Sequence, residues 1–178
     1  DLEDEVPVDV PLSRVSLTSN PWFRYAKTSA STEEGYRTLF TADAVRDLIS
    51  YGVGCILGRY SLDQPGLILA DQGSTLDDYL RSVPEPTFRP DSDGIIPATD
   101  GEWFEDDIVT RFRDFLAVAF GREHLEENVR YIEDVLGKSL RQYFVKDFYP
   151  DHCKRYSNRP IYWMFSSRPD SRASFRAL

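Results

Sequence analysis

Hydrophobic side chains recur at intervals of three and four positions in several parts of this 178-residue chain. That spacing places them on one face of an α-helix. The first such segment covers residues 41–60. Thr41 is suited to cap its start, and Asp43 falls in the first turn, where a negative charge is favourable. We therefore predict a helix here, with its hydrophobic face turned toward the core.

The same pattern predicts a helical region over residues 102–150. Its first helix runs from Glu102 to Phe120, and Trp103 and Phe104 open its hydrophobic stripe. Acidic residues at its start and Gly121 after its end match the usual helix boundaries. The other two helices are predicted over residues 123–136 and from residue 140 up to Pro150.

The remaining segments have weaker periodicity. Residues 1–40 read as an extended or loop segment, and residues 61–101 as an irregular region rich in proline. Within that region we expect a short buried strand at Leu67–Ala70, helical turns at Thr75–Ser82, and a core anchor at Ile95–Ile96. Residues 151–178 form a basic segment, with a strand predicted at Ile161–Phe165. The predicted fold is α+β, mainly α-helical with a few short strands, in one compact domain over residues 1–178.

Small residues are concentrated near the end of the first predicted helix. Ser50, Gly54 and Gly58 are spaced by four positions and form a smooth stripe against which another helix could pack. The run from Gly52 to Gly58 also comes close to the glycine fingerprint of dinucleotide sites, but it is one residue too long. A helix precedes it, whereas that fingerprint follows a strand. Close helix packing is therefore favoured over ligand binding.

Charge is distributed unevenly along the chain, whose formal net charge is −9. Residues 1–107 hold 21 acidic and 8 basic side chains, whereas residues 138–178 hold 3 acidic and 9 basic ones. The overall acidity disfavours nonspecific nucleic-acid binding, which depends on neutralising phosphates. The basic end, with tyrosines among its lysines and arginines, still allows a local DNA contact. Alternatively, it is a solvated face or a surface for a neighbouring domain.

No segment carries a complete catalytic motif. Asn20-Pro21-Trp22 resembles part of the target-base loop of amino-group DNA methyltransferases, but the second proline and a glycine-rich methyl-donor loop are missing. A turn followed by a core tryptophan explains it better. The acidic groups at 77–78 and 105–107 are explained by helix capping, and the two histidines lie in no ligand-spaced cluster. We therefore expect no catalytic, cofactor or metal site in this chain.

Two widely separated cysteines and the lack of a long apolar run favour a cytoplasmic protein with reduced thiols and no membrane partner. Nearly the whole chain, moreover, carries long motifs that are similar to those of one family. These motifs are Glu5-Val6-Pro7, Ser50 to Asp63, Pro65 to Ile68, Glu102 to Ile108, Phe148-Tyr149 and Arg159 to Ser167. On them the chain resembles part of the BREX-system adenine-specific DNA methyltransferases, the PglX family, which are phage-defence proteins related to type IIG restriction–modification enzymes.

The resemblance implies a parent protein several times longer that uses S-adenosylmethionine to methylate adenine N6. In such a parent, the cofactor loop and the adenine-contacting motif would lie upstream of this fragment. No catalytic or cofactor residue is carried over, because none of those motifs occurs here. The likeness weakens after Ser167, where the family continues with Ser-Phe-Asn-Ala-Leu and this chain has Ser174-Phe175-Arg176-Ala177-Leu178.

Three interpretations follow. In the first, the chain is a noncatalytic region after the methyltransferase core that supports DNA target recognition or interdomain scaffolding. The residues expected to contact duplex DNA or the rest of the parent are Arg59, Tyr60, Lys154, Arg155 and Arg159. In the second, the chain binds other protein parts, including defence-system subunits, without touching DNA. The weakest alternative is a stand-alone metal-dependent nuclease, which would need carboxylates gathered in one cleft.

Overall fold

A computed structural model describes residues 20–26, 28, 32–71 and 73–155, together with the backbone of two short strands at 163–166 and 174–177. The chain divides into two compact units, Asp1–Val45 and Arg46–Leu178. Each unit is described by itself below. The prediction of a mainly α-helical chain is confirmed for the described residues. Arg159 and the first two residues of the predicted strand, Ile161 and Tyr162, lie outside them, and the rest of that strand coincides with part of β1 (Trp163–Ser166).

The first unit contains a short helix, α1 (Pro21–Arg24), whose start explains the Asn20-Pro21-Trp22 motif. The Asn20 side chain accepts a hydrogen bond from the Trp22 backbone N–H at 3.2 Å, and proline occupies the first helical position. The ring of Trp22 contacts that of Tyr36, with centroids 4.6 Å apart. The motif is thus a capped helix start followed by a packed tryptophan, as the incomplete pattern indicated.

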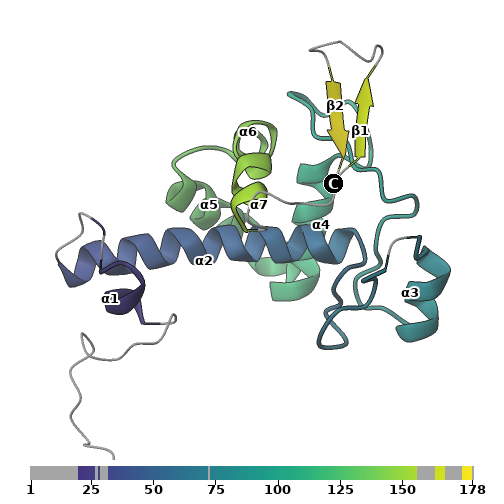
Figure 1. Cartoon of the computed structure of the whole chain (residues 1–178), viewed down its shortest axis with the longest axis horizontal. Helices are drawn as coiled ribbons and strands as arrows, with labels where there is room; N and C mark the ends of the chain where they lie inside the picture. The colour runs from purple at the N-terminus through teal and green to yellow at the C-terminus, as the bar shows by residue number, and fades with distance from the viewer. Residues whose placement is uncertain are drawn as a thin grey trace, which may run out of the picture. The chain divides into compact units, whose positions relative to one another are not determined.

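Helix α2 (Glu33–Ile56) is longer than predicted (Figure 1). The sequence placed its start at Thr41, but this position lies inside the helix, so that boundary was wrong. The structure instead uses Thr32, whose hydroxyl oxygen accepts a hydrogen bond from the Gly35 N–H at 3.1 Å. Glu33 and Glu34 then supply the favourable first-turn charges. The capping residue thus lies nine positions before Thr41, the cap that the hydrophobic stripe indicated.

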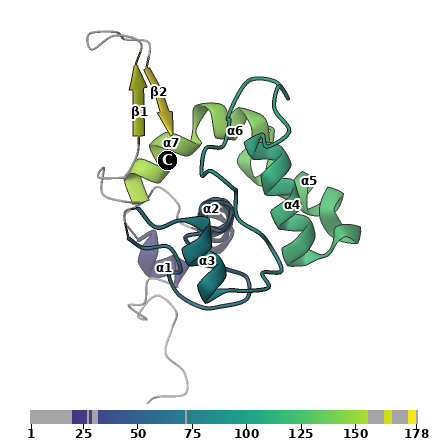
Figure 2. The same ribbon diagram turned by 90° about the vertical axis from the view of Figure 1, so that its right-hand side faces the viewer.

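The second unit holds the C-terminal part of α2 and the helices that follow it. In chain order these are α3 (Leu76–Ser82), α4 (Ile108–Phe120), a 3₁₀ turn (Arg122–His124), α5 (Leu125–Leu136), α6 (Leu140–Lys146) and α7 (Phe148–Arg155). Figures 1 and 2 show α4 to α7 gathered beside this part of α2, with α3 near its C-terminal end. Strands β1 (Trp163–Ser166) and β2 (Ser174–Ala177) pair antiparallel, with Trp163 opposite Ala177.

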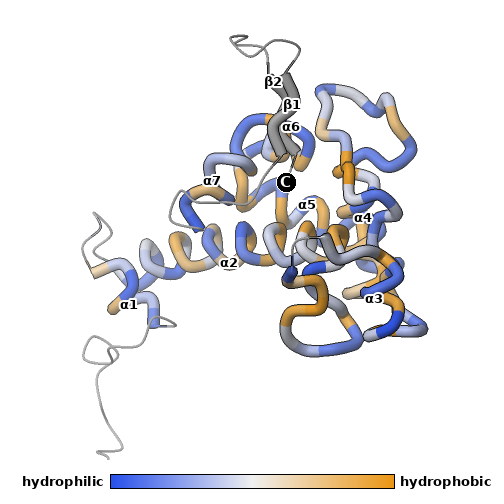
Figure 3. Tube along the Cα trace, turned by 45° about the vertical axis from the view of Figure 1, so that its right-hand side comes forward, coloured by the Kyte–Doolittle hydropathy of each residue, from blue (hydrophilic) through white to orange (hydrophobic). Residues whose placement is uncertain are grey.

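Aromatic side chains dominate the core of the second unit. Phe112 and Phe115 of α4 are almost completely buried, and Phe112 packs edge-on against Phe144 of α6 at 5.6 Å. Phe144 in turn contacts Phe148 of α7 at 5.5 Å. Along the trace, hydrophobic and hydrophilic positions alternate around each of the longer helices (Figure 3). The core is therefore built from the inward faces of α2 to α7, each of which carries buried hydrophobic residues.

The start of α4 differs from the prediction. The helix begins at Ile108, and the preceding Trp103 and Phe104 are 74% and 54% exposed rather than part of the buried stripe. Asp107 explains the boundary, because its side chain accepts a hydrogen bond from the Val109 N–H at 2.9 Å and so caps the helix. Capping by an acid was predicted correctly. Extending the hydrophobic stripe across that cap was wrong.

Three further expectations need correction. Leu67–Ala70 is not a strand, and Leu67 is 51% exposed. Ile95 is 49% exposed, so it does not anchor its loop in the core. Pro150 does not end a helix but lies in the first turn of α7, where its missing N–H costs nothing. The expected turns at Thr75–Ser82 are confirmed as α3, with a reciprocal capping box between Thr75 and Asp78.

Candidate functional site

The end of helix α2 is built as a tight turn that orients the residues after it. Gly58 adopts a left-handed conformation with φ of +75°. Its N–H donates to the Cys55 carbonyl at 3.1 Å, while the N–H of Arg59 donates to the Gly54 carbonyl at 2.8 Å. These two bonds form a Schellman cap, which satisfies the last carbonyls of the helix. The cap fixes the direction in which Arg59 and Tyr60 leave α2.

The glycines at this helix end have separate roles. A Cβ on Gly54 would lie 2.4 Å from the ring of Tyr60, so the ring rests directly on the helix backbone. A Cβ on Gly58 would meet Leu69 and Pro90. The expected packing of another helix on the Ser50, Gly54 and Gly58 stripe is therefore wrong. Helix α4 does pack closely on α2 at Gly52, where an added Cβ would meet Phe112 and Phe115.

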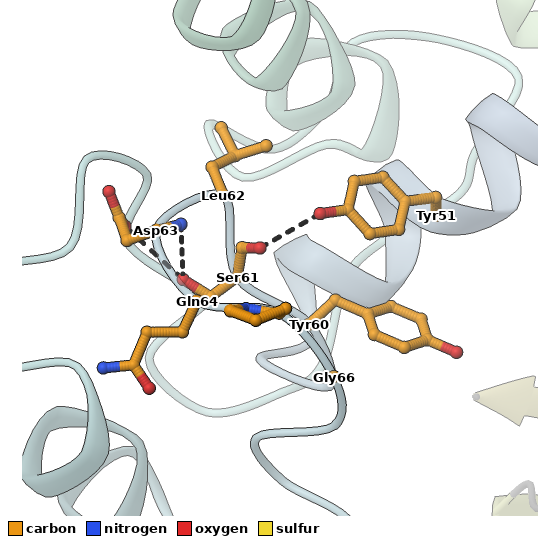
Figure 4. Close-up of a pocket in the computed structure, with 8 residues that line it drawn as sticks. Tyr51, Tyr60, Ser61, Leu62, Asp63, Gln64 and Gly66 are labelled. Atoms are coloured by element: carbon orange, nitrogen blue, oxygen red, sulfur yellow. Dashed lines mark hydrogen bonds between the residues drawn. The ribbon is translucent and has the colours of Figure 1, made fainter.

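A shallow cavity of about 500 Å³ lies over the loop that follows this turn (Figure 4). It is lined by Tyr51, Tyr60, Ser61, Leu62, Asp63, Gln64, Pro65 and Gly66. The rings of Tyr51 and Tyr60 are stacked, with centroids 5.3 Å apart and planes inclined by 29°. The Tyr51 hydroxyl donates to the Ser61 carbonyl at 3.0 Å, and the hydroxyl of Tyr60 points away from the loop. The cavity thus has an aromatic wall and a polar loop.

The polar side chains of this loop hold it in place. Asp63 accepts hydrogen bonds from the backbone N–H of Thr87, at 2.9 Å, and from its hydroxyl. These bonds lower the pKa of Asp63 below its usual value, chiefly through the Thr87 hydroxyl. Gln64 donates from Nε2 to the Ser82 carbonyl at 2.7 Å. Because these groups have structural partners, the cavity is suited to stacking and backbone contacts rather than to acid–base chemistry.

Arg59 lies next to Tyr60, one of the residues that line the cavity. Its guanidinium carbon is 5.9 Å from the centroid of the Tyr60 ring, near the outer limit of a cation–π contact. Its charge also reaches His152 of α7. Burial lowers the pKa of His152, and the charge of Arg59 lowers it further. The structure therefore brings Arg59 close to α7, which carries the other described basic candidates.

Those candidates have acidic neighbours within the chain. The guanidinium of Arg155 pairs with Asp47 of α2, and the Lys154 ammonium lies 3.7 Å from Asp151. Lys154 remains 76% exposed, whereas Arg155 is only 28% exposed at its side chain. A DNA phosphate would have to compete with Asp47 for Arg155. Of the predicted contact residues, Lys154 and Arg155 thus lie on α7, and both already take part in ion pairs.

The most extensive polar contact among the described residues of this unit was not predicted from the sequence. Arg141 of α6 forms a two-pronged ion pair with Asp107, and both N–O distances are 2.9 Å. Its Nη1 also donates to the carbonyls of Thr99 and Gly101, at 3.0 and 3.1 Å. Asp107 is completely buried, and its hydrogen bonds raise the pKa of Arg141. The partners lie 34 positions apart, so no local pattern could reveal them.

The acidic groups considered for metal binding have structural roles. Asp78 takes part in the capping box of α3, and Asp107 caps α4 while pairing with Arg141. Across the described ranges, no three His, Cys, Asp or Glu side chains are arranged to hold a metal ion. The metal-nuclease alternative gains no support from this part of the chain. Within the same ranges, every helix is too short or too polar to cross a bilayer.

The chain matches no family model. Two curated proteins are clearly similar to it. The adenine-specific methyltransferase BrxX of Escherichia coli O9:H4 (strain HS) is 39% identical over 167 residues, which covers 86% of this chain and 14% of that protein. The adenine-specific methyltransferase PglX of Lacticaseibacillus casei (strain Zhang) is 40% identical over 144 residues, covering 75% of this chain and 11% of that protein.

Both alignments cover most of this chain but only a small part of each relative. Such identity over so long a stretch confirms the resemblance seen in the motifs. The chain is homologous to one short segment of the BrxX and PglX adenine-specific methyltransferases.

Proposed function

We propose that this chain is a noncatalytic segment of an adenine-specific DNA methyltransferase of a BREX-like phage-defence system. In that parent, S-adenosylmethionine and the target adenine are bound by other regions, and this segment supports target recognition or holds domains together. The observation that supports the proposal most directly is the homology to a small segment of BrxX and PglX. Neither a methyl-donor loop nor a complete target-base motif occurs in its sequence. A cytoplasmic location follows from the same proposal.

The turn after α2 favours a DNA contact within this role. The Schellman cap holds Arg59 and Tyr60 in fixed directions, and the stacked Tyr51 and Tyr60 rings form the wall of an open cavity. An arginine beside stacked tyrosines is suited to contact a phosphate and an unpaired or flanking base. Preorganisation matters here, because less conformational entropy is lost when the residues bind.

The test is a titration of the 178-residue chain with a labelled DNA duplex at several salt concentrations. We expect log K to fall with log salt, since phosphate neutralisation releases counterions. Arg59→Ala should reduce the magnitude of the slope by about one and weaken binding to all sequences. Arg81→Ala, an exposed arginine on α3, is the matched control and should change neither. Circular dichroism and a melting curve establish that each variant is folded.

A slope of log K against log salt near zero for the unsubstituted 178-residue chain rejects direct DNA contact and leaves the scaffolding role. The scaffolding role is favoured by the ion pairs of Lys154 and Arg155, because these two basic side chains are already paired with acidic residues of the same chain. In that case the partners are the rest of the methyltransferase or other defence-system subunits. An equal response to Arg59→Ala and Arg81→Ala would exclude Arg59 as a specific contact.

A further inference from the structure

The connection between α3 and α4 presents two aromatic side chains to solvent. Trp103 is 74% exposed, more than any other large hydrophobic residue in the described part of the chain, and the adjacent Phe104 is 54% exposed. We call residues 97–107 the tryptophan loop. Single exposed hydrophobic residues are common, but an adjacent Trp-Phe pair in the open is typical of an interaction surface.

The tryptophan loop is held at both ends and in its middle. The Ile108 N–H donates to the Pro97 carbonyl at 2.9 Å and closes the loop at its base. Arg141 binds two of its carbonyls and the buried carboxylate of Asp107. A Cβ on Gly101 would lie 2.8 Å from the Trp103 ring nitrogen, so the indole lies against the loop backbone. The exposed rings are therefore presented from a fixed framework, which lowers the entropy lost on docking.

Charge around the loop restricts what it can bind. Residues 90–107 contain seven acidic and no basic side chains. Asp107 is buried and paired, whereas Asp100, Glu102 and Glu105 are exposed. A surface of this sign repels the phosphates of nucleic acid and attracts lysine and arginine. The face fits a protein partner rather than DNA.

We propose that the tryptophan loop docks into an apolar pocket bordered by lysine and arginine on another domain of the parent methyltransferase. The parent's identity rests on the function proposed above. The matched segment is only 14% of the Escherichia coli relative, so most of such a polypeptide lies outside it and can supply the pocket. Trp103 is the anchor, since buried tryptophans dominate interface energetics. The acidic rim steers the approach and fixes its orientation.

The test measures binding of this chain to the Escherichia coli relative expressed without its matching segment. We expect a complex whose affinity falls as the salt concentration rises. Trp103→Ala should weaken it at least tenfold, and Glu105→Lys should weaken it at low salt. Tyr131→Ala is the control, because Tyr131 is another exposed aromatic, at 56%, on helix α5. That variant should bind like the unchanged chain, and all variants should melt alike in isolation.

Where the shortened relative does not fold, the same variants are compared in a chimera that carries this chain in place of the matching segment. There Trp103→Ala should lower the melting temperature or expose new protease sites, and Tyr131→Ala should not. The proposal is overturned by absence of binding between folded partners, or by equal effects of the two variants. A dimer of the isolated chain or a DNA complex that depends on Trp103 would also overturn it. The Arg59 titration tests the DNA role independently of these results.

Discussion

Cys55 shows what burial does to a single reactive group. It lies on α2 and is 1% exposed, next to the Tyr51 ring that lines the cavity. Burial raises the pKa of the Cys55 thiol to about 11, and burial likewise raises the pKa of Tyr51 to about 12. Both groups therefore stay protonated near neutral pH. Cys153, by contrast, is only partly buried.

The folded chain should consequently show one accessible thiol. At pH 8 we expect Cys153 to react with a chromogenic disulfide reagent, while Cys55 reacts only as the chain unfolds. The folded state also binds the Cys55 proton more tightly than the unfolded state does. Stability should therefore hold below about pH 9 and fall as the pH rises toward about 11. Urea unfolding curves across this range measure the decline.

Cys153→Ser is the control for the thiol assay, and it should leave no fast phase. Cys55→Ala should make the stability less steeply dependent on pH between the same limits, leaving the contribution of Tyr51. Fast modification of both thiols in the folded chain would contradict the buried position of Cys55.

Helix contacts depend on where a glycine lies along α2. At Gly52 an added Cβ would lie 2.7 Å from Phe112 and 2.9 Å from Phe115, both in the core. At Gly54 it would meet Tyr60, a half-buried ring at the rim of the cavity. The same helix thus offers two glycines with different neighbours.

Gly52→Ala should lower the free energy of unfolding by about 2 kcal/mol, because overpacking a dense core costs more than the gain in helix propensity. Gly54→Ala is the matched variant, since the propensity gain is the same. Its cost should be about 1 kcal/mol or less, because the Tyr60 ring can move outward. Chemical denaturation measures both. A Gly52→Ala chain as stable as the original would contradict the close contact of α2 with α4.

The ion pair between Asp107 and Arg141 joins the start of α4 to α6. Asp107→Asn keeps a side-chain oxygen to cap Val109 but removes the charge that faces Arg141. We expect a loss of about 3 kcal/mol, since the guanidinium then lacks its buried counter-charge. Combining Asp107→Asn with Arg141→Met should recover part of the lost stability, because the unpaired guanidinium is then removed as well. Unfolding in urea compares the two variants with the unchanged chain, and a neutral single substitution would contradict this role.

At the scale of elements, the sequence predicted what local spacing encodes. Helices α3 and α5 agree with the prediction, because the Thr75–Asp78 capping box marks the start of α3, and periodic hydrophobic residues followed by Gly137 mark α5 and its end. The start of α4 was misplaced, since Trp103 and Phe104 continue the periodicity beyond the Asp107 cap. The loop that carries these rings is bound by Arg141, which is remote in sequence. Local pattern cannot distinguish a buried stripe from an exposed pair held by a distant residue.

For the whole molecule, the separation of acidic and basic segments is partly offset by folding. Arg155 in the basic segment pairs with Asp47 in the acidic half. If Arg155 contacts DNA, the phosphate must displace this carboxylate or share the guanidinium with it. The competition offers a direct test of the predicted contact.

Asp47→Asn should strengthen DNA binding severalfold, because it removes the carboxylate charge that competes with a phosphate for Arg155. Arg155→Ala should weaken binding, and it should abolish the gain when combined with Asp47→Asn. The free energy of unfolding should change by less than about 1 kcal/mol, as expected for a partly exposed ion pair. Fluorescence anisotropy titrations of DNA with the unchanged chain, the two single variants and the double variant measure how far the two substitutions affect each other. Equal affinities in all four would remove Arg155 from the contact set.

Residue order alone was sufficient to identify the relationship to BrxX and PglX, the mainly helical character and the bounds of α3. These depend on residue order and local spacing, which need no tertiary contacts to be read. Three features became visible only in the folded chain: Tyr60 rests on Gly54, Arg141 reaches Asp107, and Trp103 faces solvent. Each of these depends on residues made neighbours by folding, and burial is a property of that arrangement rather than of any residue type.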